Sequence, residues 1–102
     1  MEIKLRKEMF PALLNGTKTS TSRLGKRDVS VGENLYFVMT EDANITFSSK
    51  VSNVSYCTFG ELTEEEAIRE GYSNLSELKN ALNKIYHPTN DDIFTLIEFE
   101  TH

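Results

Sequence analysis

The sequence predicts an α+β fold, a curled sheet or small barrel flanked by short helices. Three observations lead to this class. Strand-like segments, with one short helical segment among them, fill residues 2–59. Two segments with helical period and capping residues follow in residues 62–87. A last strand-like segment closes the chain, and strands grouped around segregated helices are typical of α+β domains.

The first elements are a strand and a brief helix. Apolar and polar residues alternate in residues 2–6, which predicts a strand. In the helix that follows, Pro11 is tolerated in the first turn, and we expect Leu13 and Leu14 to face inward. Gly16 is well placed just beyond the helix end.

Two strand predictions occupy the middle of the chain. Residues 34–40 form a continuous apolar run, which indicates a buried strand, and we expect Tyr36 and Phe37 in the core. Residues 45–59 alternate for long enough to be one bent strand, or two strands joined near Lys50.

Two capped helices are predicted next. Thr63 and Glu66 have the spacing of a capping box, and this helix should end at Gly71. Asn74 with Glu77 three residues later caps the second helix. The apolar residues of the second helix step by three, four and three along one face: Leu75, Leu78, Leu82 and Ile85.

The final strand is predicted in residues 92–100, and its pairing with the first strand is left open. We interpret residues 1–102 as a single domain, because this length suits one core and contains no repeat or long linker. The charged N-terminal segment is unlike a secretory signal, and no apolar run approaches the roughly 18 residues of a membrane helix.

Cysteine and histidine usage narrows the chemistry. Cys57 is the one cysteine, which excludes an internal disulfide and fits a reducing compartment, so a cytoplasmic location is expected. His87 and His102 lie far apart, and no cluster of metal-ligand residues is apparent. We therefore expect neither a metal nor an organic cofactor.

The charge is distributed unevenly. Residues 1–30 carry seven Lys and Arg against three Asp and Glu, whereas residues 31–102 carry four against thirteen. A protein that grips a long nucleic acid needs a broad basic face. Positive charge concentrated in the N-terminal third suits a small or local anionic contact better.

The segment Gly16–Arg23, GTKTSTSR, is unusually rich in hydroxyls and lies between two apolar segments. As a linker it would separate the first helix from everything it can pack against. Alternating Ser and Thr favour a strand instead. A solvated edge strand protected by charge and a strand lining a polar cleft both stay open.

The pattern Gly-x-Lys-x-x-Thr-x-Arg, read from Gly16 to Arg23, resembles the signature of the ASCH (activating-signal-cointegrator homology) domain. VGENLYF resembles the start of a strand in that family, and LTEEEAIREGYSNLSELKNAL resembles its acidic helix pair. The likeness runs from about Ile3 to Phe99. In length and layout the chain is most similar to the small bacterial N(4)-acetylcytidine amidohydrolases of that family.

This resemblance implies a PUA-like fold, a small mixed barrel flanked by helices, in a superfamily associated with RNA. It also implies a catalytic set: Lys18 as base, Thr21 as nucleophile and Glu70 as proton donor. Ligand contacts are expected from Arg23, Tyr72 and Thr19, with the Tyr72 ring stacking on a pyrimidine. Stacking of a base on an aromatic ring is energetically useful.

The implied set is chemically coherent. A threonine hydroxyl needs a neighbouring base, and a lysine acts as a base only when neutral. Burial and the permanent charge of Arg23 would lower the pKa of Lys18 from its usual value of about 10.4. Glu70 lies at the negative end of a helix dipole with Glu66 one turn before it, which favours the protonated acid.

The spacing poses a geometric condition. In a regular strand Lys18 and Thr21 point to opposite faces, whereas Thr19, Thr21 and Arg23 share a side. We therefore predict an irregularity between Gly16 and Thr21, either a turn that contains Lys18 or a bulge.

Two functions from different classes follow. The first is an enzyme that hydrolyses an acylated cytosine nucleoside. The second is a non-catalytic module that binds RNA through Lys18, Arg23 and the adjacent basic turn. The acidic remainder of the chain favours the enzyme, because it would repel a long polyanion. A regulatory protein that binds another ligand, the choice between nucleoside and RNA as substrate, and the oligomeric state stay open.

Overall fold

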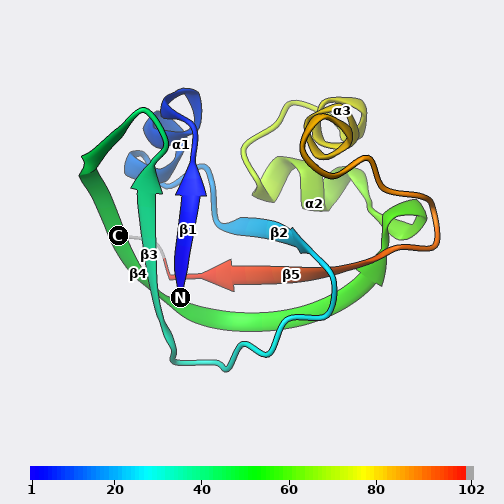
Figure 1. The fold of residues 1–102 in the computed structure, drawn as a ribbon, viewed down its shortest axis with the longest axis horizontal. Coiled ribbons are helices and arrows are strands. Elements are labelled where there is room, and N and C mark those ends of the chain that lie inside the picture. The colour runs from blue at the N-terminus through cyan, green and yellow to red at the C-terminus, as the bar shows by residue number, and fades with distance from the viewer. Residues whose placement is uncertain (101–102) are drawn as a thin grey trace.

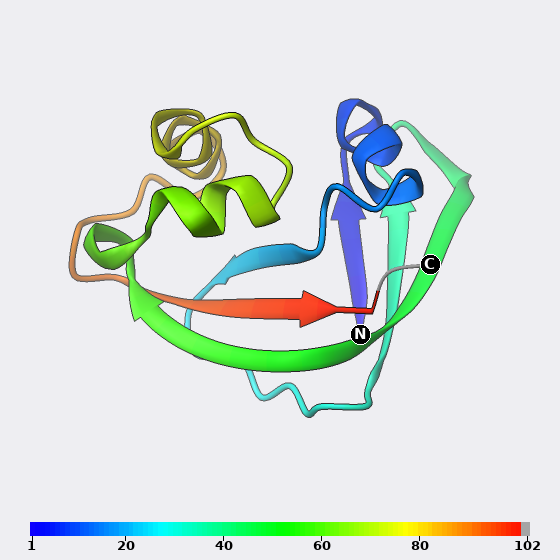
Figure 2. The same ribbon diagram turned by 180° about the vertical axis from the view of Figure 1, so that it is seen from behind.

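The computed structural model describes residues 1–100, and it confirms the predicted α+β class (Figure 1). A five-stranded mixed sheet curls into a half-barrel, with short helices at its two ends (Figures 1 and 2). In chain order the elements are β1 (Glu2–Leu5), η1 (Lys7–Met9), α1 (Phe10–Leu14), β2 (Ser20–Leu24), β3 (Asn34–Met39), β4 (Asp42–Thr58), η2 (Phe59–Glu61), α2 (Glu64–Arg69), α3 (Leu75–Tyr86) and β5 (Ile93–Phe99).

The strand order is β1-β3-β4-β5-β2, in which β1 runs parallel to β3 and all other pairs are antiparallel. The long strand β4 is one bent strand. It pairs with β3 as far as Lys50 and with β5 from Val51 onward, with a register shift between Val51 and Asn53. The strand β5 has β4 on one side and β2 on the other, so it does not pair with β1, and β1 and β2 are the two edges of the sheet.

Two apolar clusters fill the half-barrel. The first lies where α1, β1 and β3 meet the middle of β4 and the end of β5, and the second lies beneath α2 and α3 (Figure 1). The buried members of the first are Ile3, Phe10, Leu13, Val29, Leu35, Phe37, Val51, Ile97 and Phe99. Those of the second are Phe59, Leu62, Ala67, Leu78, Leu82 and Phe94.

Three residues expected in the core are exposed: Leu14, Tyr36 and Ile85. Leu14 follows buried Leu13 in a helix of five residues, and neighbours on a helix differ by about 100°, so one faces outward. Tyr36 follows the alternation of β3 and lies on its outer face.

The packing of the last turn of α3 explains why Ile85 is exposed. Tyr86 rather than Ile85 packs onto the second cluster, and its ring meets that of Phe94 edge-on with centroids 5.7 Å apart. Leu78 and Leu82 are buried and Leu75 is partly buried, as the helical spacing predicts.

The caps of the two acidic helices lie where the sequence places them. Gly71 follows α2 with φ 95°, a conformation that favours glycine. The side chain of Asn74 accepts a hydrogen bond of 2.9 Å from the backbone N of Glu77. No helix in the described part of the chain is long and apolar enough to cross a membrane.

Candidate active site

Lys18 lies in the turn between α1 and β2 rather than in the strand, so the predicted irregularity is present. Gly16 turns the chain with φ 81°, and the backbone N of Lys18 donates to the carbonyl of Ala12 at 2.9 Å. This directs the lysine inward, where it is only 2% exposed. Its Nζ donates to the backbone carbonyls of Ser20, at 2.9 Å, and Glu70, at 3.0 Å.

The environment of Lys18 favours the neutral amine. Burial lowers its pKa from the ordinary value, whereas the nearby charges of Glu70 and Glu66 act in the opposite direction. This is the direction that the sequence predicts. The cause is burial and not the charge of Arg23, which we expected to contribute.

Glu70 is the C-cap residue of α2 and is 3% exposed. Its Oε2 accepts a hydrogen bond from the hydroxyl of Ser22 on β2. Burial, followed by a hydrogen bond with Glu66, raises the pKa of Glu70 to about 8, against smaller opposing effects of Lys18 and Ser22. The carboxyl is therefore mainly protonated at neutral pH, as a proton donor requires.

A polar network that the sequence did not predict surrounds this acid. The hydroxyl of Ser20 donates to Oε2 of Glu66 at 2.8 Å, and Nη2 of Arg69 donates to its Oε1 at 3.0 Å. Thr63 accepts from the backbone N of Glu66 at 3.2 Å, as a cap should. The Glu66 carboxylate, however, bonds across to β2 instead of completing the capping box. The features of the sequence that could have predicted this network are two serines at alternate positions of a strand and two glutamates four residues apart on a helix.

Thr21 is 5% exposed and lies between these two serines. Alternate residues of a strand point to opposite faces. Ser20 and Ser22 point to α2, so Thr21 points to the other face of β2. The residue paired with it on the neighbouring strand β5 is Ile97, which belongs to the first cluster. Within residues 1–100 its hydroxyl makes no hydrogen bond.

The structure thus brings Lys18 and Glu70 into contact but not the Thr21 side chain and the Glu70 carboxyl. The link to Thr21 is indirect: Nζ of Lys18 contacts the carbonyl of Ser20, which belongs to the peptide group that precedes Thr21. The three groups surround one short piece of β2, an edge strand of the sheet.

The expected ligand contacts have different surroundings. Arg23 is half-buried on the Thr21 face of β2, opposite Thr95. Tyr72 is half-buried, and burial raises its pKa, with smaller effects of the charges of Glu70 and Glu77 in the same direction. Thr19 is held by its backbone, which donates to Arg69 at 2.7 Å and accepts from Phe99 at 3.0 Å.

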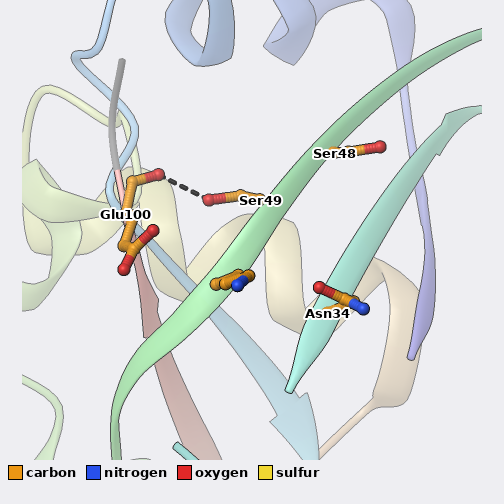
Figure 3. Close-up of a pocket in the computed structure, with 5 residues that line it drawn as sticks. Asn34, Ser48, Ser49 and Glu100 are labelled. Atoms are coloured by element: carbon orange, nitrogen blue, oxygen red, sulfur yellow. Dashed lines mark hydrogen bonds between the residues drawn. The ribbon is translucent and has the colours of Figure 1, made fainter. Parts of the chain in front are cut away.

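Two surface hollows lie elsewhere. One of about 300 Å³ lies on β3 and β4 near the end of β5 (Figure 3), where the Ser49 hydroxyl donates to the Glu100 carbonyl at 2.5 Å. Another of about 200 Å³ is lined by residues of β4, η2 and β5, including Cys57. Neither contains Lys18, Thr21 or Glu70. Within residues 1–100 no three His, Cys, Asp or Glu side chains are grouped as metal ligands would be.

The sequence and the fold of this chain are similar to those of known proteins. The family model for the ASCH domain matches residues 2–101. An N(4)-acetylcytidine amidohydrolase from Moritella marina is 36% identical over 85 residues, which cover 81% of this chain and 77% of that protein. Two solved structures share the fold. The ASCH domain from Lactobacillus crispatus has a TM-score of 0.81 and 16% identity over 98% of this chain and 79% of that one. The ASCH protein from Zymomonas mobilis has a TM-score of 0.75 and 14% identity over 99% of this chain and 66% of that one.

Proposed function

This chain belongs to the ASCH domain family, and we propose that it is an amidohydrolase that removes the acyl group from N(4)-acetylcytidine or a related acylated cytosine nucleoside. The observation that carries the proposal is the contact between Nζ of Lys18, a buried lysine of lowered pKa, and the backbone carbonyl of Glu70, whose own buried carboxyl has a raised pKa. Such a base and acid suit an acyl transfer near neutral pH. The kinship with an N(4)-acetylcytidine amidohydrolase supports the choice of substrate.

The proposed reaction has two steps. Neutral Lys18 takes the proton of the Thr21 hydroxyl, whose oxygen attacks the amide carbon and forms an ester. The C–N bond breaks as Glu70 gives its proton to the leaving amine nitrogen. The ammonium of Lys18 then returns a proton to Glu70, and water activated by Lys18 hydrolyses the ester and restores the threonine.

The location of Thr21 sets a condition on this mechanism. Its side chain and the Glu70 carboxyl lie on opposite faces of β2, so the acyl group must lie against the edge of that strand to reach both. The three groups are buried, so substrate access must displace part of the surrounding chain. Half-buried Tyr72, near Glu70, is the aromatic side chain that we propose to contact the base.

We favour a nucleoside over RNA as the ligand because of charge. Residues 31–102 carry four Lys and Arg against thirteen Asp and Glu. A long polyanion would be repelled by most of this surface. The cytoplasmic location inferred from Cys57 stays a prediction.

A deacylation assay tests the proposal. The purified chain is incubated with N(4)-acetylcytidine, and free cytidine is measured by chromatography. Thr21→Val removes the hydroxyl and should reduce turnover by at least about 100-fold, whereas Thr21→Ser should retain it. Thr46→Val is the matched control, because it makes the same change at an exposed position of β4.

Two results would contradict the assignment. Turnover kept in Thr21→Val would show that Thr21 is not the nucleophile. No turnover in the wild type, together with salt-sensitive RNA binding that Arg23→Ala abolishes, would establish the binding module instead.

A further inference from the structure

Two carboxyl groups are buried side by side in the interface between α2 and β2. Glu66 and Glu70 are four residues apart, so they share one face of the helix. Both are almost fully buried, and the Glu70 carboxyl is hydrogen-bonded to Glu66. Two neighbouring carboxyls in a buried site do not both ionise readily, so one of them retains a proton.

The contacts of Glu66 indicate which carboxyl holds the negative charge. Its two oxygens accept from Arg69, at 3.0 Å, and from Ser20, at 2.8 Å. A guanidinium donor stabilises the carboxylate form of its partner. Glu66 is therefore the better placed of the pair to be the anion.

The contacts of Glu70 are different. Its carboxyl meets the hydroxyl of Ser22 and the carboxyl of Glu66, and Nζ of Lys18 donates to its backbone carbonyl rather than to its carboxyl. We propose that Glu66 is a positioning residue: held as an anion by Arg69 and Ser20, it keeps the shared proton on Glu70. The use of that proton rests on the proposed function, but its location does not.

Other titratable groups around the pair come from every packed element. Lys18, in the turn before β2, opposes the effect of Glu66 on Glu70, and Tyr72 approaches from the loop after α2. Cys57 on β4 is affected by the charges of both acids, and Glu98 on β5 acts on Arg69. Glu66 and Lys18 thus act on Glu70 in opposite directions, and removal of Glu66 should release the proton at lower pH.

The test is a titration of the Glu70 carboxyl by carbon NMR in the full chain, with the resonance assigned by its loss in Glu70→Gln. In Glu66→Gln the pKa of Glu70 should fall by at least about one unit, roughly a tenfold change in proton affinity. Glu65→Gln is the matched control. Glu65 also pairs with Arg69, at 2.8 Å, but its side chain is 80% exposed, so it should leave the pKa unchanged.

A second variant guards against misfolding of the first. Arg69→Gln keeps both carboxyls but removes the cation that holds the charge on Glu66, so part of the shared proton should move to Glu66. The carbon shift of the Glu70 carboxyl at neutral pH should then move toward its ionised value. An unchanged pKa in Glu66→Gln together with an unchanged carbon shift in Arg69→Gln would overturn the inference, as would an equal fall of the pKa in Glu65→Gln.

The activity readout separates this inference from the proposed function. The alkaline limb of the pH profile of kcat/KM should move to lower pH in Glu66→Gln and stay in place in Glu65→Gln, because Glu70 must be protonated to act as the acid. If the pKa shifts as expected but the wild type does not deacylate the nucleoside, the inference stands and the proposed function fails. If the wild type is active and the pKa of Glu70 does not shift in the variants, the proposed function stands and the inference about Glu66 fails.

Discussion

The first core cluster and the interface between β2 and α2 are both closed to solvent, but they are built from opposite materials. The cluster consists of apolar side chains around Phe37, whose ring lies 4.9 Å from that of Phe99. The interface buries an amine, hydroxyls and carboxyls: Lys18, Ser20, Ser22, Glu66 and Glu70.

The two regions contribute differently to stability. Apolar burial stabilises a fold by roughly 25 cal/mol per Å². The desolvation cost of buried ionisable groups is offset only when the groups are well paired. Proteins in which apolar residues replace such groups are often as stable as the original or more stable. Stability therefore accounts for the first region but not for the second, whose composition suits proton transfer.

The largest expected effect is on the apolar side of this comparison. Phe37→Ala should lower the free energy of unfolding by about 3–5 kcal/mol, because it leaves a cavity between Phe47 and Phe99. Urea denaturation measures the loss. The deacylation rate per folded molecule should stay near the wild-type value, and a specific loss of that rate would show that the two regions are coupled.

The second largest expected effect concerns the polar interface between β2 and α2, and it is a dependence of the stability on pH. The pKa of Glu70 is raised from its ordinary value of 4.5 to about 8, so the folded state binds a proton more tightly than the unfolded state does. Its stabilising effect is complete below about pH 4.5 and is lost as the pH rises through about 8. Between these values the free energy of unfolding should fall with pH by up to about 1.4 kcal/mol per unit.

Glu70→Gln should remove this slope while keeping the shape of the side chain. Urea denaturation of the wild type and of Glu70→Gln at pH 5, 6, 7 and 8 makes the comparison. Equal slopes in the two proteins would mean that Glu70 does not hold a proton in the folded state.

The smallest effect lies outside both regions, at the start of α3. Asn74→Ala removes the cap on the backbone N of Glu77 and should cost about 1 kcal/mol. Asn80→Ala, at an exposed position inside the same helix, should change stability by less than about 0.5 kcal/mol. Thermal unfolding measures both. A loss of deacylation in Asn74→Ala would show that the interface depends on α3.

Local features of the candidate site were predictable from the sequence. The turn around Lys18 follows from the odd spacing to Thr21, and the directions of the pKa shifts of Lys18 and Glu70 follow from their chemistry. The partners were not predictable in the same way. Ser22 and Glu70 are 48 residues apart, and Ser20 and Glu66 are 46 apart, so no local pattern connects them.

The sequence by itself determined the class of the fold, the order of its helices and strands, the helix caps and the family signature, because these depend on neighbours within one or two turns. The tertiary structure alone decided that β1 pairs with β3, that Leu14 and Ile85 are exposed, and which face of β2 meets α2. The physical reason is that a strand presents two faces, and only packing against the rest of the chain decides what covers each one.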